Sequence, residues 1–300
     1  MYMQNQKQTQ IRKQIQIYKG KLFHKSAGLK VNKKKVVVLD LDETIGSFAD
    51  LEILWSALCE LDAFEQTQES FNQLLDIYPE FLRYGILNIL DFLYYKKTRG
   101  FCYKLFIYTN NRFPKSWTTM IIRYLEKKQN TPRLFDQLIC AFKINDCIVE
   151  PKRTTHSKTH GDLIRCSLLP KTSEICFVDD KYFDTMTGGC VYYIQPKPYN
   201  HMMLTCDIIE RLCKSNMISN RNLALSHFLM DKFEISNTIK KSDDEIAIDR
   251  SVSQKLMFHI QEFFHLTTSS NRTQKIRNYS VGKFTRKRAR STSSSRVHTP

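Results

Sequence analysis

Two acidic residues stand close together directly after an apolar run near the start of the chain. Asp40 and Asp42 follow the apolar residues 36–39, and Thr44 comes two residues later. Because side chains alternate along an extended backbone, the two carboxylates point to the same side. Carboxylates held this close repel each other unless one is protonated or a cation lies between them, and Mg2+ prefers oxygen ligands. The pattern predicts a divalent metal site, and a solvated acidic turn is the alternative.

Polar residues also follow two later apolar runs. Thr109 and Asn110 end the second run, and Asp179 and Asp180 end the third. In a parallel sheet the carboxyl ends of the strands meet along one edge, where open α/β proteins bind their ligands. We therefore expect these residues to join the first two acids at one site.

Strand-like runs alternate with segments of helical apolar spacing between residues 36 and 215. This alternation predicts an α/β fold with one doubly wound parallel sheet. Residues 49–82 also carry helical spacing, so we expect a helical insertion after the first strand, which either covers the site or only packs. The expected strands are 36–39, 104–108, 135–142, 175–178 and 191–194, and the expected helices include 85–95 and 116–127.

The formal charge of +16 is concentrated at the two ends of the chain. Residues 1–35 contain ten Lys/Arg and no acid, and residues 271–300 contain nine Lys/Arg and no acid, so residues 36–270 carry −3. The expected divisions are a basic N-terminal arm at 1–34, the α/β domain at 35–215, a helical extension at 216–268 and a disordered basic tail at 269–300.

The arm and the extension carry weaker local patterns. Ile11, Ile15 and Tyr18 have the spacing of a short amphipathic helix in an otherwise mobile arm. In the extension, residues 222–233 and 252–264 have helical spacing, and the charged residues 240–249 between them are expected to form a surface link.

Composition bears on the compartment and the partners. Nine cysteines without a C-x-x-C pair favour a reduced, intracellular protein. The sequence contains no apolar run of 18 residues, so we expect no membrane partner. The basic cluster at 286–290 can contact nucleic acid or an import receptor, or merely solvate the tail. We expect an intracellular location, with the nucleus favoured over the cytoplasm.

The motifs together resemble those of a known superfamily. Residues 40–44 read D-L-D-E-T after a strand, and Thr109 and the Asp179-Asp180 pair end later strands in the same order as in the haloacid dehalogenase (HAD) superfamily of phosphotransferases. With R-Y-G-I-L at 83–87 before a core helix, the chain resembles the FCP/SCP branch, also called NLI-interacting-factor-like phosphatases. Several segments are similar to the version of this domain found in large DNA viruses.

The resemblance implies a role for each acid. Asp40 is the expected nucleophile, which becomes an aspartyl phosphate. Asp42 is the expected general acid and base, and its backbone carbonyl would also bind Mg2+. Asp180 would complete the metal site with Asp40. Asp179 is expected to orient the phosphate-binding lysine or to bind the metal directly.

The resemblance also implies phosphate-binding groups. Thr109 is expected to hydrogen-bond a phosphoryl oxygen, with Thr44 and Asn110 beside it. Lys158 resembles the lysine that precedes Asp-Leu in the family, although here three residues separate it from Asp162. A fixed cation is needed at this place because charge spreads over the oxygens of a phosphoryl group in transfer. Lys152 is the alternative.

The function implied is that of a Mg2+-dependent phosphoprotein serine/threonine phosphatase, an activity that this branch directs notably at the RNA polymerase II tail. Its partner would be a phosphorylated protein or peptide. One alternative is a nucleic-acid 3′-end phosphatase, which the basic ends favour and Glu43 disfavours, because those relatives usually read D-x-D-G-T. Another is a non-catalytic phosphopeptide-binding module, against which the intact motif acids argue.

Overall fold

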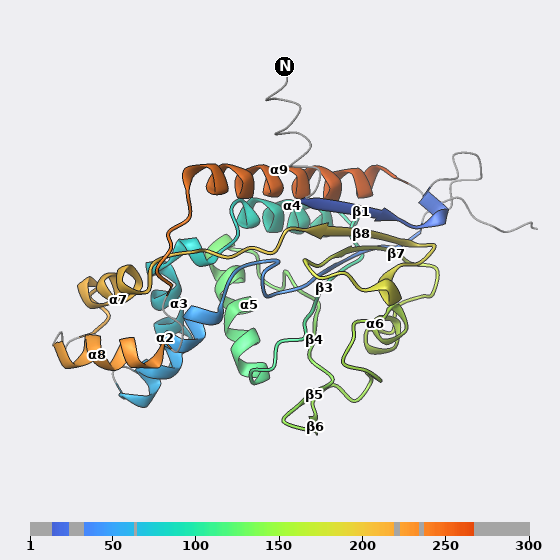
Figure 1. The fold of residues 1–300 in the computed structure, drawn as a ribbon. Helices are drawn as coiled ribbons and strands as arrows, with labels where there is room; N and C mark the ends of the chain where they lie inside the picture. The colour runs from blue at the N-terminus through green and yellow to red at the C-terminus, as the bar shows by residue number, and fades with distance from the viewer. Residues whose placement is uncertain (1–13, 24–32, 63–64, 219–222, 234–236, 267–300) are drawn as a thin grey trace, which may run out of the picture. The chain divides into compact units, whose positions relative to one another are not determined.

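The chain forms an α/β structure around a mostly parallel six-stranded sheet (Figure 1). This computed structural model describes residues 14–23, 33–62, 65–218, 223–233 and 237–266. The basic cluster at 286–290, the whole tail at 269–300 and most of the N-terminal arm lie outside these ranges.

The strand that carries the first acids lies in the middle of the sheet. The order is β1-β8-β7-β2-β3-β4, and β2 pairs in parallel with both β3 and β7. The strands predicted from the sequence are all present, and the one expected at 135–142 is shorter. Their bounds are β2 Lys35–Leu39, β3 Lys104–Tyr108, β4 Gln137–Ile139, β7 Glu174–Val178 and β8 Val191–Pro196, and a separate hairpin pairs β5 Lys143–Ile144 with β6 Cys147–Ile148.

Helices cover both faces of the sheet. Val37 and Leu39 belong to one apolar cluster and Val36 and Val38 to a second, as alternation along a strand requires. The second cluster lies under α6 (His160–Ser167), and the first extends into the other helices. These are α2 Ala49–Glu60, α3 Gln68–Ile77, α4 Ile86–Thr98, α5 Lys115–Gln129, α7 Thr205–Lys214, α8 Leu223–Lys232 and α9 Asp243–His265.

The segment between β2 and α4 is helical, as its apolar spacing predicts. It consists of α2, α3 and a short 3-10 turn at Pro79–Phe81. Helix α3 packs on α5, and α2 packs on α3 and α8. Edge-to-face contacts link Trp55 of α2 to Phe71 of α3 and Phe71 to Trp117 of α5. Of the two expectations for this insertion, these contacts support packing within the main core.

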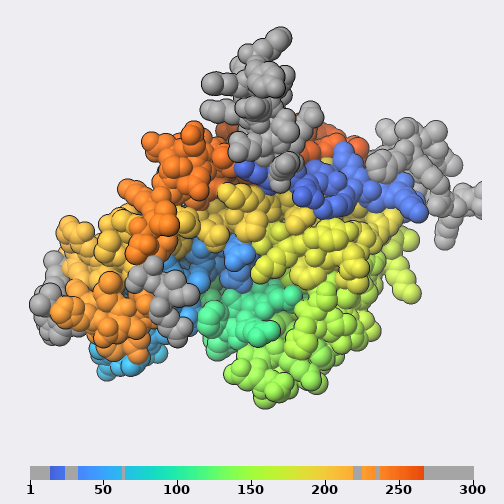
Figure 2. Space-filling model, viewed as in Figure 1, coloured from blue at the N-terminus to red at the C-terminus, as the bar shows by residue number. Residues whose placement is uncertain are grey.

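The prediction of a helix around Ile15 and Tyr18 is wrong. Residues Ile15–Lys19 form β1, an edge strand that runs antiparallel to β8 (Figure 1). In the space-filling view the blue atoms of this segment lie on the surface of the molecule (Figure 2). The edge of β8 offers unpaired backbone groups, and pairing with them satisfies the backbone of the arm as well as a helix would. Ile15 is then buried against the main core. The arm therefore contributes a strand to the sheet.

The helical extension is confirmed at both places, but its expected surface link is wrong in part. Helix α9 begins at Asp243, well inside the charged segment 240–249. Ser242 and Glu245 form a capping box, which satisfies backbone N–H groups at the helix start, and acids in the first turn favour its positive end. Helix α9 packs on β8 and β1, so it belongs to the cover of the sheet. Among the helices of the described residues, none is both long and apolar enough to cross a membrane.

Candidate active site

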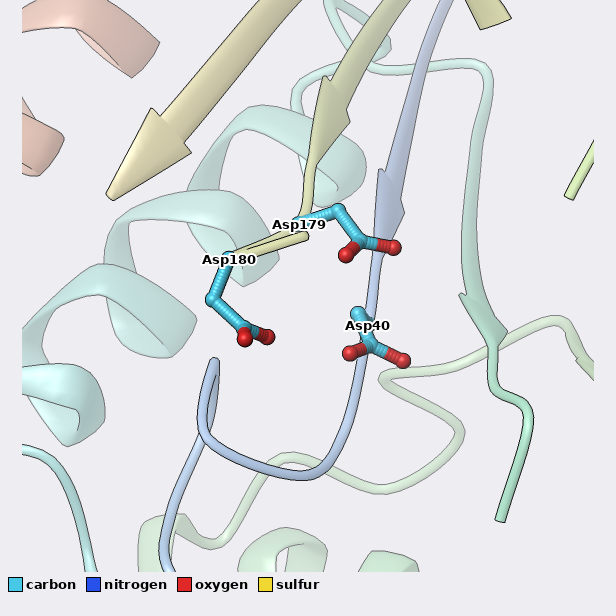
Figure 3. A group of neighbouring side chains, drawn as sticks. All are labelled: Asp40, Asp179 and Asp180. Atoms are coloured by element: carbon cyan, nitrogen blue, oxygen red, sulfur yellow. The ribbon is translucent and has the colours of Figure 1, made fainter. Parts of the chain in front are cut away.

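Three buried carboxyl groups meet at the carboxyl edge of the sheet. Asp40 follows β2, and Asp179 and Asp180 follow β7, the parallel neighbour of β2. One oxygen from each acid lies within 4.8 Å of the others, and Figure 3 shows the three side chains converging. The sequence prediction that these acids share one edge of the sheet is confirmed by their positions.

The ammonium group of Lys158 lies between two of these acids. Its Nζ atom is 2.5 Å from Oδ1 of Asp40 and 2.6 Å from Oδ2 of Asp179, and the side chain is 2% exposed. The ring centres of Tyr108 and Phe183 lie 5.7 Å and 5.6 Å from Nζ. Lys152, the alternative from the sequence, is exposed. Lys158 is therefore the lysine that faces the acids.

Burial dominates the electrostatics of this cluster. It raises the pKa of Asp40 and of Asp180, and it raises the pKa of Asp179 to about 7 although the charge of Lys158 opposes the shift. Burial alone would lower the pKa of Lys158, but Asp179 and Asp40 outweigh it and raise this pKa. The lysine stays charged, so ionisation of all three acids leaves two uncompensated negative charges.

The acids fit a hard divalent cation. Oδ2 of Asp180 is buried and has no hydrogen-bond partner among the described residues, although such a group normally has one. A cation among the three acids would supply that partner and would neutralise the two excess charges. The carboxylate donors that converge here are of the type that Mg2+ prefers.

Thr44 holds Asp180 in place. Its hydroxyl donates to Oδ1 of Asp180 at 2.9 Å and accepts from the Asp180 backbone N–H at 3.0 Å. The family resemblance implies that Thr44 lies beside the phosphate, but its single proton is already donated to Asp180. In this arrangement Thr44 positions one acid of the cluster, and a phosphoryl oxygen would find no free donor on its hydroxyl.

Asp42 is held beside the cluster by a residue that the sequence reasoning gave no role. The side-chain amide of Asn111 donates to Oδ2 of Asp42 at 2.9 Å. Burial raises the pKa of Asp42 to about 6, and the hydrogen bond from Asn111 opposes the shift.

Thr109 is buried, and its hydroxyl accepts a hydrogen bond from the Asn111 backbone N–H. The oxygen of Asn110 accepts from Arg153 at 2.8 Å, so only the amide nitrogen of Asn110 remains to meet a phosphate.

The turn that follows the first acids is tightly constrained. Glu43 has a left-handed φ of 59°, which is unfavourable for a residue with a side chain. The buried guanidinium of Arg83 donates to the carbonyls of Glu43 and Thr44 at 2.5 Å and 2.6 Å. A Cβ atom at Gly46 would lie 2.6 Å from the Phe81 carbonyl oxygen, so the close approach requires glycine. These contacts set the direction of Asp42 and Thr44.

Arg153 organises the loop that brings Lys158 to the acids, and the sequence reasoning missed it. The side chain is 2% exposed and donates to the carbonyls of Thr109 and Cys140 at 3.3 Å and 2.8 Å. It also donates to the carbonyls of His156 and Ser157, both at 3.1 Å. It thus ties the ends of β3 and β4 to the residues just before Lys158. A single arginine among many basic residues carries no sequence signal for such a role.

We expect Arg153→Met to lower the free energy of unfolding by about 3 kcal/mol, because several buried carbonyls lose their donor. Arg165→Met is the matched control. Arg165 is half exposed and forms an ion pair with Asp162, so its loss should cost less than about 1 kcal/mol. Urea denaturation of both variants measures the difference, and equal losses would contradict the role given to Arg153.

Comparison with known proteins gave no match to this chain, whether with family models, with curated proteins or with solved structures. The chemistry of the site is therefore inferred from its own residues. These residues form a buried cluster of carboxylates with one fixed ammonium group at the carboxyl edge of a parallel sheet.

Proposed function

We propose that the chain is a Mg2+-dependent phosphoprotein serine/threonine phosphatase of the HAD type, with the FCP/SCP form of its first motif. One observation carries the proposal. Asp40, Asp179 and Asp180 converge within 4.8 Å, and the buried Lys158 ammonium touches Asp40. A carboxylate beside a fixed positive charge, with room for a cation among further acids, is suited to accept a phosphoryl group.

Asp40, Asp180 and the backbone carbonyl of Asp42 would hold the ion, with Asp179 as a further candidate ligand. Bound Mg2+ would neutralise charge on the phosphate as the anionic nucleophile approaches it. Lys158 would stabilise the negative charge that spreads over the equatorial oxygens during transfer. The hydroxyl of Thr109 and the amide nitrogen of Asn110 would hydrogen-bond the same phosphoryl group.

In the first step, a carboxylate oxygen of Asp40 forms a bond to phosphorus while the bond to the serine or threonine oxygen breaks. The leaving oxygen takes a proton from Asp42 and departs as a neutral hydroxyl. Asn111 is the positioning residue here, because its bond to Oδ2 of Asp42 sets the direction of that carboxyl group. The product on the enzyme is an aspartyl phosphate at Asp40.

In the second step, water attacks the phosphorus of the aspartyl phosphate, and Asp42 accepts the proton that the water loses. The bond between phosphorus and the Asp40 oxygen breaks, which releases inorganic phosphate and restores both carboxyl groups to their starting states. Asp42 thus acts as acid first and as base afterwards, so one positioned group serves both steps.

The test is phosphate release by the full chain from phosphoserine and phosphothreonine peptides, with Mg2+ and then with excess EDTA. We expect release with Mg2+, none with EDTA, and recovery when Mg2+ is restored. A 3′-phosphorylated oligonucleotide serves as the competing substrate under the same conditions. Cleavage of the oligonucleotide with intact phosphopeptides would favour the nucleic-acid 3′-end phosphatase, and cleavage of neither substrate would favour the non-catalytic binding module.

A further inference from the structure

A cavity lies at the amino edge of the parallel strands, opposite the edge that carries the acids. Its volume is about 660 Å³, and it is lined by residues just before and at the start of β2 and β3, by the end of α4 and by the end of α9. Lys35 is the first residue of β2 and lines this cavity, whereas Asp40 follows the last residue of the same strand. A strand of this length separates the two places by about 17 Å.

The cavity is strongly basic. Five of its ten lining residues are Lys or Arg, and none is Asp or Glu. Lys35 is held by an ion pair with Glu174 at 2.9 Å and by the carbonyls of Phe263 and Leu266. Lys34, Lys96 and Arg99 supply further positive charge around the opening. The cavity therefore favours an anion.

Aromatic rings lie among these charges. Phe101 is 59% exposed and Tyr103 is 41% exposed, and both line the cavity. Nζ of Lys34 is 3.9 Å from the centre of the Tyr103 ring, and Nζ of Lys96 is 5.2 Å from that of Phe101. Each exposed ring thus has an ammonium group over it, so a base that stacks on the ring and a phosphate that pairs with the ammonium group can bind at the same place.

We propose that this cavity binds single-stranded nucleic acid, with bases stacked on Phe101 and Tyr103 and phosphates beside Lys34, Lys96 and Arg99. Exposed rings interleaved with cations are the means by which proteins bind single strands without sequence preference. In a duplex the bases are stacked inside and cannot reach the rings, and an acidic peptide offers charge without planar bases.

This inference goes beyond the proposed phosphatase. The nucleic acid is a ligand held away from the catalytic edge, and it is not the substrate of Asp40. Its binding requires neither the metal nor the nucleophile, so Asp40→Asn should leave it unchanged. Failure of the phosphatase and failure of this site are therefore distinguishable.

The test is fluorescence anisotropy of a labelled twelve-nucleotide oligo-dT titrated with the full chain. Phe101→Ala combined with Tyr103→Ala keeps every charge, and we expect it to weaken binding at least about tenfold because stacking is lost. Lys96→Gln combined with Arg99→Gln should weaken binding and reduce the slope of log K against log salt by about 1.4, as two lost phosphate contacts require. Phe258→Ala combined with Tyr182→Ala is the matched aromatic control, since both rings are exposed and lie outside the cavity.

Three results would overturn the inference. Unchanged binding by the variant lacking Phe101 and Tyr103 rings would assign the affinity to charge alone. Equal competition by a twelve-base-pair duplex or by a phosphopeptide would assign it to another class of polyanion. Loss of binding in Asp40→Asn would place the nucleic acid at the catalytic edge. Circular dichroism and thermal melting of each variant separate these results from a failure to fold.

Discussion

Asp40→Asn is expected to abolish phosphopeptide turnover, with a loss of at least about 10³-fold, because an amide cannot form the aspartyl phosphate. The fold should survive, since Lys158 keeps its contact with Asp179 at 2.6 Å and the substituted side chain has nearly the same shape. Phosphate release measures the loss. A second readout is thermal melting with beryllium fluoride and Mg2+, which should stabilise the wild-type chain and leave the variant unchanged.

Asp146→Asn provides the matched control for this substitution. Asp146 lies in the turn between β5 and β6 with a left-handed φ of 61°, a conformation that Asn tolerates as well as Asp. It should turn over phosphopeptides at the wild-type rate. Full activity in Asp40→Asn would remove the nucleophile from the proposed mechanism, and activity lost equally in both variants would show that the loss is not specific to the site.

Lys158→Met should cost both stability and activity. Methionine is close to lysine in length, but Asp40 and Asp179 lose the ammonium group that compensates their charges. Removing one partner from a buried ion pair lowers the free energy of unfolding by about 3–5 kcal/mol. Turnover should fall by about 10³-fold, because a fixed cation at the transferring phosphoryl group contributes on this scale.

Lys152→Met tests the alternative lysine under the same conditions. Lys152 is exposed, so we expect stability within about 0.5 kcal/mol of wild type and unchanged turnover. Adding Asp179→Asn to Lys158→Met removes one uncompensated charge and should restore part of the stability without restoring turnover. If Lys152→Met loses turnover while Lys158→Met keeps it, the roles of the two lysines are reversed.

The elements that carry the acids could be predicted because their signals are local. Residues 36–39 and 175–178 are continuous apolar runs, which suit strands buried on both faces, and each run stops at its acids. The helices of residues 49–82 follow from apolar spacing alone. Such patterns report which face of an element is buried, and burial is the strongest local constraint on a sequence.

Contacts between distant segments could not be predicted in the same way. The spacing of Ile11, Ile15 and Tyr18 predicts a short helix, yet the open edge of β8 pairs residues 15–19 as a strand. No sequence pattern marks Arg153. Its acceptors are four backbone carbonyls between residues 109 and 157 and the side-chain oxygen of Asn110, and only folding brings these five groups together. Asn111 likewise gains its partner, Asp42, only when β2 and β3 lie side by side.

The sequence by itself determined the chemistry available at the site. The order of Asp40, Asp42, Thr109 and Asp180 at the ends of apolar runs follows from residue type and spacing, and a parallel sheet must bring such ends to one edge. Only the tertiary structure decided which lysine faces the acids and which groups hold one another. Thr44 bonds to Asp180 across 136 residues of sequence, and Lys158 reaches Asp40 across 118. Burial then raises the pKa values of the carboxyl groups, because their desolvation depends on all the residues that surround them in the folded chain.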